Sequence, residues 1–258
     1  MDSRDASSAQ RIAELEAELC RRTEQLARAK AELIDFASVV GHDLRSPLLT
    51  ISGYCDLLRY EYVGRLDESA DHYLKSTIDG VARVNRLLED LLGYARLQSV
   101  SCPTDKVELD QVVADALSNL DGAIGESGAT VKVESLPCVR GNHGQLVQVF
   151  QNLVDNAVKF RGPDRPIIAV SAEPESDGHV VRVADNGVGI EPEHREVVFQ
   201  IMRRLAKTRG LPGTGIGLAI CRRIVECHGG RIWIESRNSA GATVSVWLPG
   251  AETTPSAV

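Results

Sequence analysis

Apolar residues near the start of the chain are spaced alternately three and four positions apart. The series runs through Ile12, Leu15, Leu19, Leu26, Ala29, Leu33, Phe36 and Val40, with Arg22 as its one polar break. Heptad spacing kept for about four repeats is typical of parallel coiled coils. We therefore expect residues 1–34 to form a coiled-coil helix and the chain to be a homodimer. The alternative is an amphipathic helix packed on its own domain.

Helical spacing continues beyond this segment, pauses at residues 63–67 and resumes over 68–97. Asp67 stands where it can cap the second helix, because aspartate accepts hydrogen bonds from the first free backbone N–H groups. Two long helices joined by a short turn make a helical hairpin. Its broad apolar face needs a partner, so two copies would form a four-helix bundle. We assign residues 35–98 to this dimerisation domain.

The pattern changes after the hairpin. Residues 99–106, SVSCPTDK, are polar with a proline and predict a linker. Beyond them the predicted strands are KVELD, ATVKVES, IIAVSAE, HVVRVADN, RIWIES and ATVSVWLP. Three helices are predicted: one that follows KVELD and ends at Ser127, one over Gly144–Phe160 and one over Gly215–His228. Residues 107–249 therefore predict an α/β sandwich with helices on one face of a mixed sheet. The fold class is multidomain, α and α+β, and residues 250–258 are expected to be a disordered tail.

Composition narrows the function classes. The 258 residues are 43% hydrophobic and 25% charged, and the formal charge of −7 argues against nucleic-acid binding. The sequence has no apolar run of membrane-spanning length and no signal-peptide core, which predicts a cytoplasmic protein. The cysteines stand at 20, 55, 102, 138, 221 and 227 without a CxxC pair. We expect all of them to be reduced packing residues.

Three short segments of the second domain carry chemistry: NLVDNAVKF at 152–160, DNGVGI at 185–190 and GTGIGLA at 213–219. Asn152 and Asn156 share one helix face, where an amide oxygen can ligate Mg²⁺ while a triphosphate supplies the negative charge. Lys159, one turn further on, can reach phosphate oxygens. Any one of these residues alone would more simply be part of a solvated helix face.

The second and third segments are rich in glycine. Asp185 ends an apolar strand, where its carboxylate needs a hydrogen-bond donor. Glycines at 187 and 189 let the backbone approach a ligand closely. Those at 213, 215 and 217 lead into a helix whose free N–H groups can hold phosphate. The pattern is neither a Walker loop nor a Rossmann turn.

In this order and spacing the segments resemble the N, G1 and G2 boxes of the GHKL ATPase superfamily, and FQIMRRL at 199–205 resembles the F box of its histidine kinase branch. The resemblance implies that Asn156 is the Mg²⁺ ligand, that Asn152 orients the surroundings of the γ-phosphate and that Asp185 binds the adenine amino group. The implied ATP-binding set is Asn152, Asn156, Lys159, Phe160, Asp185, Gly187, Gly189, Ile190, Gly213, Thr214, Gly215, Gly217 and Leu218.

Residues 191–212 are expected to form a mobile lid that carries Arg203, Arg204, Lys207 and Arg209. Cations beside the γ-phosphate stabilise the charge that develops in phosphoryl transfer. Arg204 aligns with the family's phosphate-contacting arginine. Met202 departs from the family, in which an aromatic residue is usual at this place.

The remaining motif, FASVVGHDLRSP at 36–47, resembles the H box of sensor histidine kinases. The resemblance implies that His42 is the phosphoryl acceptor and that Asp43 fixes its tautomer and takes its proton. Pro47 removes a helical hydrogen bond just past the acceptor. Ser46 stands where the family often has Thr or Asn, which argues against phosphatase activity.

The chain thus resembles the transmitter region of a two-component sensor kinase, loaded by Mg²⁺ and ATP and emptied onto the receiver domain of a response regulator. The input would come from a sensor upstream of a truncated chain or on a separate protein. One alternative is an ATP-driven clamp like the gyrase, Hsp90 and MutL branches, against which Asn152 argues because those hydrolases carry a glutamate there. Others are a non-catalytic adaptor and a kinase whose main output is dephosphorylation.

Overall fold

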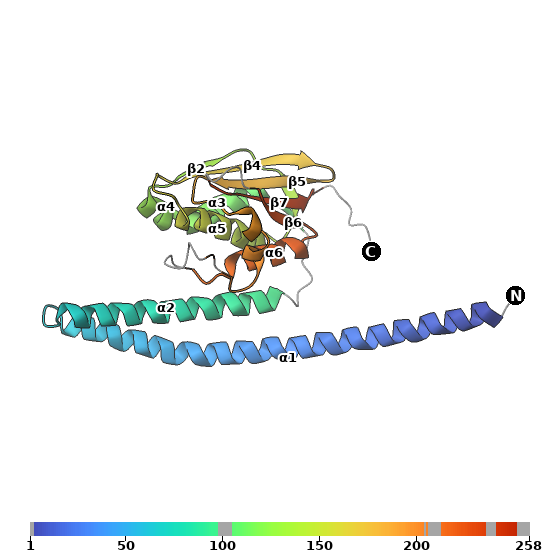
Figure 1. Ribbon diagram of the computed structural model, residues 1–258, viewed down its shortest axis with the longest axis horizontal. Coiled ribbons are helices and arrows are strands. Elements are labelled where there is room, and N and C mark those ends of the chain that lie inside the picture. The colour runs from blue at the N-terminus through green and yellow to red at the C-terminus, as the bar shows by residue number, and fades with distance from the viewer. Residues whose placement is uncertain (1–2, 98–104, 204, 206–212, 236–240, 252–258) are drawn as a thin grey trace. The chain divides into compact units, whose positions relative to one another are not determined.

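The computed structural model describes residues 3–97, 105–203, 205, 213–235 and 241–251. The chain divides into two compact units, Met1–Ser99 and Val100–Val258. The first is helical and the second combines helices with sheets (Figure 1). Within the described ranges, no helix is both long and apolar enough to cross a membrane.

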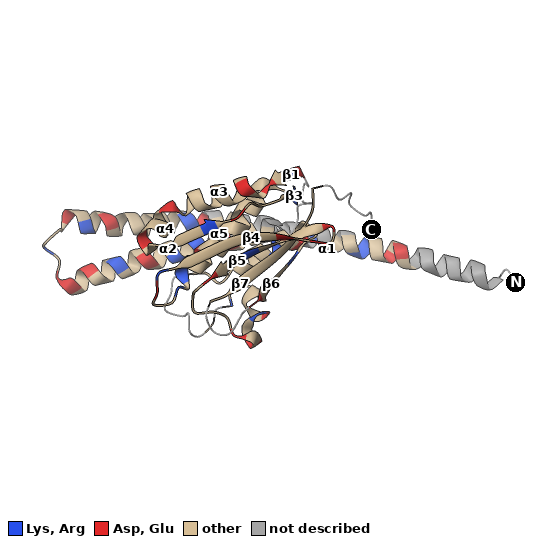
Figure 2. Cartoon of the chain, turned by 90° about the horizontal axis from the view of Figure 1, so that it is seen from above, with Lys and Arg blue, Asp and Glu red and all other residues tan. Residues whose placement is uncertain are grey.

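The first unit is a hairpin of α1 (Ser3–Glu61) and α2 (Glu68–Leu97). The predicted cap is confirmed, because the N–H of Ala70 donates to Asp67 Oδ1 at 2.7 Å. The helices approach closely at Gly41, where a Cβ would lie 2.6 Å from Leu92 Cδ1. Charges of both signs alternate along the hairpin (Figure 2), and Arg45 pairs with Glu89 across it at 2.8 Å.

The main sheet of the second unit has five strands in the order β2-β4-β5-β7-β6. They are β2 (Thr130–Val133), β4 (Ile167–Glu175), β5 (Gly178–Asp185), β7 (Thr243–Pro249) and β6 (Arg231–Glu235). β2 pairs with β4 in parallel and the other pairs are antiparallel, so the sheet is mixed as predicted.

Helices cover one face of this sheet (Figure 1), which confirms the predicted sandwich. They are α3 (Leu109–Asn119), α4 (Asp121–Ser127), α5 (His143–Lys159) and α6 (Gly217–Cys227). Alternate strand residues such as Val170, Val183 and Val246 are buried with Phe150 of α5 and Ile224 of α6. Each such side chain contributes about 1.5–3 kcal/mol when it is removed from water.

A second, two-stranded sheet pairs β1 (Asp105–Glu108) with β3 (Cys138–Gly141) in antiparallel fashion. β1 begins inside the stretch 99–106 that we expected to be a linker. The sequence patterns did not reveal β3, because its four residues CVRG are too few to show an alternation of apolar and polar positions.

The face of the main sheet opposite the helices carries a polar network. The Arg231 guanidinium lies 5.2 Å from the ring centre of Trp233 and 5.8 Å from that of Trp247, and it pairs with Glu175. The indole N–H of Trp233 donates to Glu235 at 2.9 Å. Cations on aromatic faces are stabilised by the ring quadrupole, so these contacts hold neighbouring strands together on the exposed side.

One cysteine departs from expectation. Cys227, at the end of α6, is disulfide-bonded, so the prediction that all six cysteines are reduced is wrong at this residue. A disulfide joins positions that the tertiary fold brings together, which spacing along the chain does not reveal. Cys20, Cys55, Cys138 and Cys221 are not disulfide-bonded, and Cys102 lies outside the described residues. Burial raises the pKa of the Cys221 thiol to about 12, which keeps it protonated and inert.

His228 joins α6 to α5. This residue is 3% exposed, with Nδ1 2.7 Å from the carbonyl oxygen of Ile224 and Nε2 accepting from the N–H of Asn142 at 2.9 Å. These partners assign the neutral ring with its proton on Nδ1. Asn142 in turn caps α5 by accepting from the N–H of Gln145 at 3.0 Å. The end of α6 therefore positions the beginning of α5.

This histidine predicts a pH-dependent stability for the second unit. Burial lowers the pKa of His228 below its ordinary 6.5, so the unfolded chain binds more protons between the two values. The contribution of His228 to the free energy of unfolding is fully present above pH 6.5, and it is lost as pH falls towards and through the folded-state pKa. Urea unfolding of the wild type should show a lower midpoint at acidic pH than at pH above 7.

His228→Leu should lose this part of the pH slope. It should also be less stable at neutral pH by about 1–3 kcal/mol, because the Asn142 N–H is left without its acceptor. Equal pH slopes for the wild type and the variant would contradict the assignment.

Candidate functional site

Asp185 lies at the end of β5 and is half-buried. Its Oδ1 accepts from the N–H of Gly187 at 2.8 Å and from that of Ala242 at 3.1 Å. Burial raises the pKa of this carboxyl, and the two backbone donors offset only part of that shift. No described residue donates to Oδ2, so this oxygen is left for a hydrogen-bond donor on a ligand.

Two glycines around Asp185 leave no space for a side chain. A Cβ on Gly241, whose φ is +86°, would lie 1.8 Å from the backbone oxygen of Asp185. A Cβ on Gly187 would lie 2.4 Å from the backbone oxygen of Phe160. Gly241 and Ala242 are site residues that sequence reasoning missed; a glycine just before the last strand was the one signal that could have indicated them.

Helix α5 carries the predicted asparagines and lysine. Asn152 Nδ2 lies 3.5 Å from the backbone oxygen of Gly217, the first residue of α6. At the other end, the N–H of Val188 donates to the backbone oxygen of Phe160 at 3.0 Å. The structure thus brings the three predicted segments together around α5. The Lys159 ammonium pairs with Asp155, a neighbour on the same helix face that we had not singled out.

The glycine-rich segment before α6 takes a backbone conformation that favours glycine. Gly215 has a φ of +75°, and Thr214 Oγ1 accepts from the N–H of Ile216 at 3.4 Å. Gly217 and Leu218 form the first turn of α6, where the N–H groups have no partner within the helix. Such a helix start, after a glycine-rich loop, can bind phosphate.

The stretch that precedes this loop is only partly described. It contains two short 3-10 helices, η1 (Pro192–His194) and η2 (Val197–Phe199). Gly189 and Ile190 lead into it from β5, and Arg203 Nε donates to Gln200 at 3.2 Å. The predicted lid residues Arg204, Lys207 and Arg209 lie outside the described residues.

The predicted acceptor lies in the other unit. His42 and Asp43 are neighbours on α1, where Asp43 is exposed; the His42 side chain is outside the described part of the structure. Pro47 lies within the same helix. Because proline has no N–H, the carbonyl group of Asp43 loses its usual helical hydrogen bond.

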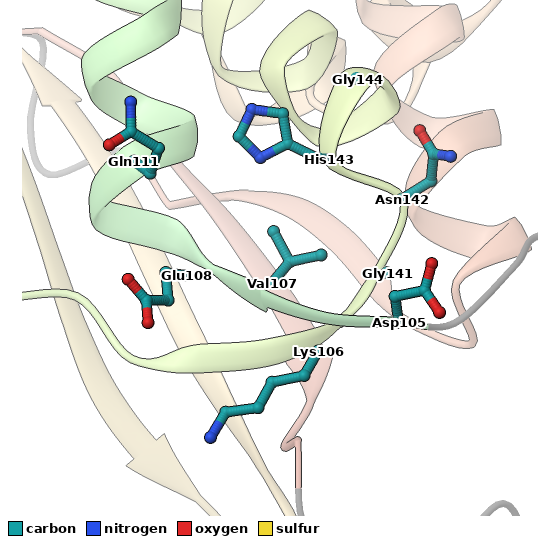
Figure 3. A pocket seen from close by; sticks show the side chains of 9 residues that line it. All are labelled: Asp105, Lys106, Val107, Glu108, Gln111, Gly141, Asn142, His143 and Gly144. Carbon is teal, nitrogen blue, oxygen red and sulfur yellow. The ribbon is translucent and has the colours of Figure 1, made fainter.

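A pocket elsewhere in the second unit is not part of this site. It lies where β1 and β3 meet the start of α5 and includes Asp105, Lys106, Glu108 and His143 (Figure 3). None of the predicted nucleotide-binding residues lines it. His143 Nε2 lies 2.8 Å from Asp115 Oδ2, and this hydrogen bond is the main reason why the Asp115 pKa is lowered.

Two family models match the chain. Residues 32–100 match the His Kinase A (phospho-acceptor) domain, and residues 141–252 match the histidine kinase-, DNA gyrase B- and HSP90-like ATPase. The chain belongs to the histidine kinases. This confirms the predicted resemblance to a sensor-kinase transmitter region, with an ATP-binding domain as its second unit.

Relatives of this chain include two longer proteins. Cyanobacterial phytochrome A of a Nostoc species is 39% identical over 232 residues, which cover 90% of this chain and 30% of the relative. Phytochrome-like protein Cph1 of a Synechocystis species is also 39% identical over 232 residues, covering 90% of this chain and 31% of the relative. The chain thus spans less than a third of the length of these relatives.

A solved structure shares the fold of this chain. Full-length ShkA, in complex with AMPPNP, superposes with a TM-score of 0.65 at 23% identity, covering 83% of this chain and 45% of ShkA.

Gly241→Ala tests the Asp185 site. The added methyl group would overlap the Asp185 backbone, so we expect calorimetry to show loss of ATP affinity by at least about a hundredfold. Gly229→Ala is the matched control, because Gly229 also has a positive φ, +73°, but open space around it. The control should cost about 1–2 kcal/mol of stability and leave ATP affinity unchanged. Equal affinity losses in both variants would contradict the proposed geometry.

Proposed function

We propose that this chain is an ATP-dependent protein-histidine kinase that phosphorylates His42. The observation that carries the proposal is the half-buried Asp185 carboxylate, fixed through one oxygen by Gly187 and Ala242. Its other oxygen suits the amino group of adenine, which is a donor. The same domain places a glycine-rich helix start beside α5, and the chain carries a phospho-acceptor domain.

The residues around Asp185 suit a Mg·ATP complex. Backbone N–H groups from Gly215 to Leu218 would hold phosphate oxygens. Lys159 would exchange its contact with Asp155 for phosphate. Asn156 would ligate Mg²⁺ through its amide oxygen, which is a hard ligand that leaves the remaining positions to phosphate and water. Asn152 would orient the γ-phosphate, while Phe160, Gly189, Ile190, Gly213 and Thr214 would line the site.

The proposed reaction is an in-line displacement at the γ-phosphorus. A ring nitrogen of neutral His42 attacks, an N–P bond forms, and the bond from phosphorus to the β,γ-bridging oxygen breaks to release ADP. Asp43 takes the proton that the ring loses, and Arg204 stabilises the charge on the equatorial oxygens. The phosphoryl group then passes to an aspartate on the receiver domain of a separate response regulator, and a sensor domain controls the cycle.

The hairpin supports a homodimer, because each helix exposes an apolar stripe. On α1 the stripe contains Leu44, Ile51, Tyr54 and Leu58, and on α2 it contains Tyr73, Val84 and Leu91. Most neighbours within a stripe are three, four or seven positions apart, the spacing of residues that pack between helices in a bundle. Leu15 and Leu19 of the predicted coiled coil are also exposed. A second copy would cover these stripes in a four-helix bundle.

His42→Gln tests the proposed acceptor. After incubation with Mg²⁺ and γ-labelled ATP, the wild type should carry label that survives base and is lost in acid, as a P–N bond requires. His42→Gln should carry none, whereas His72→Gln, which changes an exposed histidine on α2, should keep it. Label persisting in His42→Gln would contradict the assignment. Absence of label from all three proteins, with ATP still bound, would favour a non-catalytic adaptor.

Tyr54→Arg tests the dimer. Tyr54 lies in the α1 stripe and is 65% exposed in the protomer. Burying an arginine between helices is costly, so sedimentation should show a weaker dimer, with a dissociation constant at least about tenfold higher than that of the wild type. Leu49→Arg is the matched control: Leu49 is 57% exposed but lies outside the stripe. Dissociation constants that rise equally in both variants would contradict the assigned interface.

A further inference from the structure

Arg222, in the middle of α6, contacts three other side chains. Its Nη1 lies 3.1 Å from Glu196 Oε2 and its Nε lies 3.1 Å from Glu226 Oε1. The guanidinium carbon also lies 5.5 Å from the centre of the Phe199 ring. A planar guanidinium can make all of these contacts at once, which a lysine ammonium cannot.

Two of these partners come from a different segment of the chain. Glu196 precedes η2 and Phe199 is its last residue, whereas Glu226 lies one turn further along α6 itself. Phe199 is 4% exposed and its neighbour Val198 is also buried. Arg222 therefore joins η2 to α6 through both a charged contact and an aromatic one.

The place of this contact gives it a functional meaning. η2 ends where the F-box sequence FQIMRRL begins, and α6 starts with the turn that we propose to hold phosphate. The Arg222 contacts thus fix the two ends of the segment 200–216 relative to each other. Arg222 itself projects from the second turn of α6, beyond the residues proposed to bind nucleotide.

We infer that Arg222 is a positioning residue for phosphoryl transfer, which holds η2 against α6 and so keeps the first turn of α6 in place for the triphosphate. This inference rests on the proposed use of ATP. Its action is on the phosphate end of the nucleotide. The adenine end depends on Asp185, which Arg222 does not contact.

The two carboxylates provide a test within the molecule. Both Glu196 and Glu226 lie 3.1 Å from the same guanidinium. Of the two carboxylates, only Glu196 joins α6 to the start of η2; Glu226 lies on α6 itself. If Arg222 acts by joining these elements, loss of Glu196 matters and loss of Glu226 does not.

The experiment compares binding of Mg·AMP-PNP by calorimetry with binding of adenosine by NMR titration. Arg222→Ala should weaken the binding of AMP-PNP about five- to tenfold and leave the binding of adenosine unchanged. Arg222→Lys should recover part of the loss. Glu196→Gln should also weaken the binding of AMP-PNP, and Glu226→Gln should bind it like the wild type. Where Arg222→Ala unfolds, Arg222→Lys and the two glutamine variants still decide the question.

Arg231→Ala is the matched control, because Arg231 also combines an ion pair with aromatic contacts in this domain, on the opposite face of the sheet. It should bind both ligands like the wild type. Equal losses in Arg222→Ala and Arg231→Ala, equal losses of adenosine and AMP-PNP, or equal effects at Glu196 and Glu226 would each overturn the inference. If the wild type binds AMP-PNP but never labels His42, the proposed function fails while this comparison remains valid.

Discussion

The hydrogen bonds from Gly187 and Ala242 to the Asp185 carboxylate are the contacts on which the site depends. A half-buried carboxylate is costly unless donors satisfy it. Here they come from two loops that are distant in sequence. The pairing of β5 with β7, with Ala184 opposite Thr243, brings those loops together. One oxygen of Asp185 is thereby fixed and the other is left for a ligand.

The rest of the site is assembled from helices that pack on the same sheet. Phe160, just beyond α5, accepts from Val188 beside Asp185, and Asn152 meets the start of α6. His228 ties the end of α6 back to the capped start of α5. The proposed adenine, metal and phosphate elements are therefore each held to α5.

Local signals in the sequence were sufficient for much of this architecture. The hairpin turn, the Asp67 cap and the extent of α2 follow from apolar spacing and one capping residue, and the structure confirms them. The three nucleotide-binding segments were recognised because each is a short run with its own residue types. The structure brings them together around α5, while the roles of individual residues such as Asn156 stay predictions.

What the sequence did not reveal depends on contacts between distant positions. Gly241 matters because of the backbone of Asp185, and His228 because of Asn142. Cys227 was misjudged because its bonding depends on the tertiary fold. Arg222 looked like one more charge on a helix, and its contacts with Glu196 and Phe199 appear only once η2 is placed. None of these partners is related by a helical or strand period, so pattern reasoning could not pair them.

The central claim, that Asp185 makes this an adenine-specific phosphoryl-transfer site, is tested most directly by calorimetric titration with Mg·ATP and with Mg·ITP. The two nucleotides differ where ATP has the amino donor and ITP has a carbonyl acceptor. The account predicts that ITP binds at least about a hundredfold more weakly, because a site built to accept a hydrogen bond would face a second acceptor. Equal affinities for the two nucleotides would contradict it.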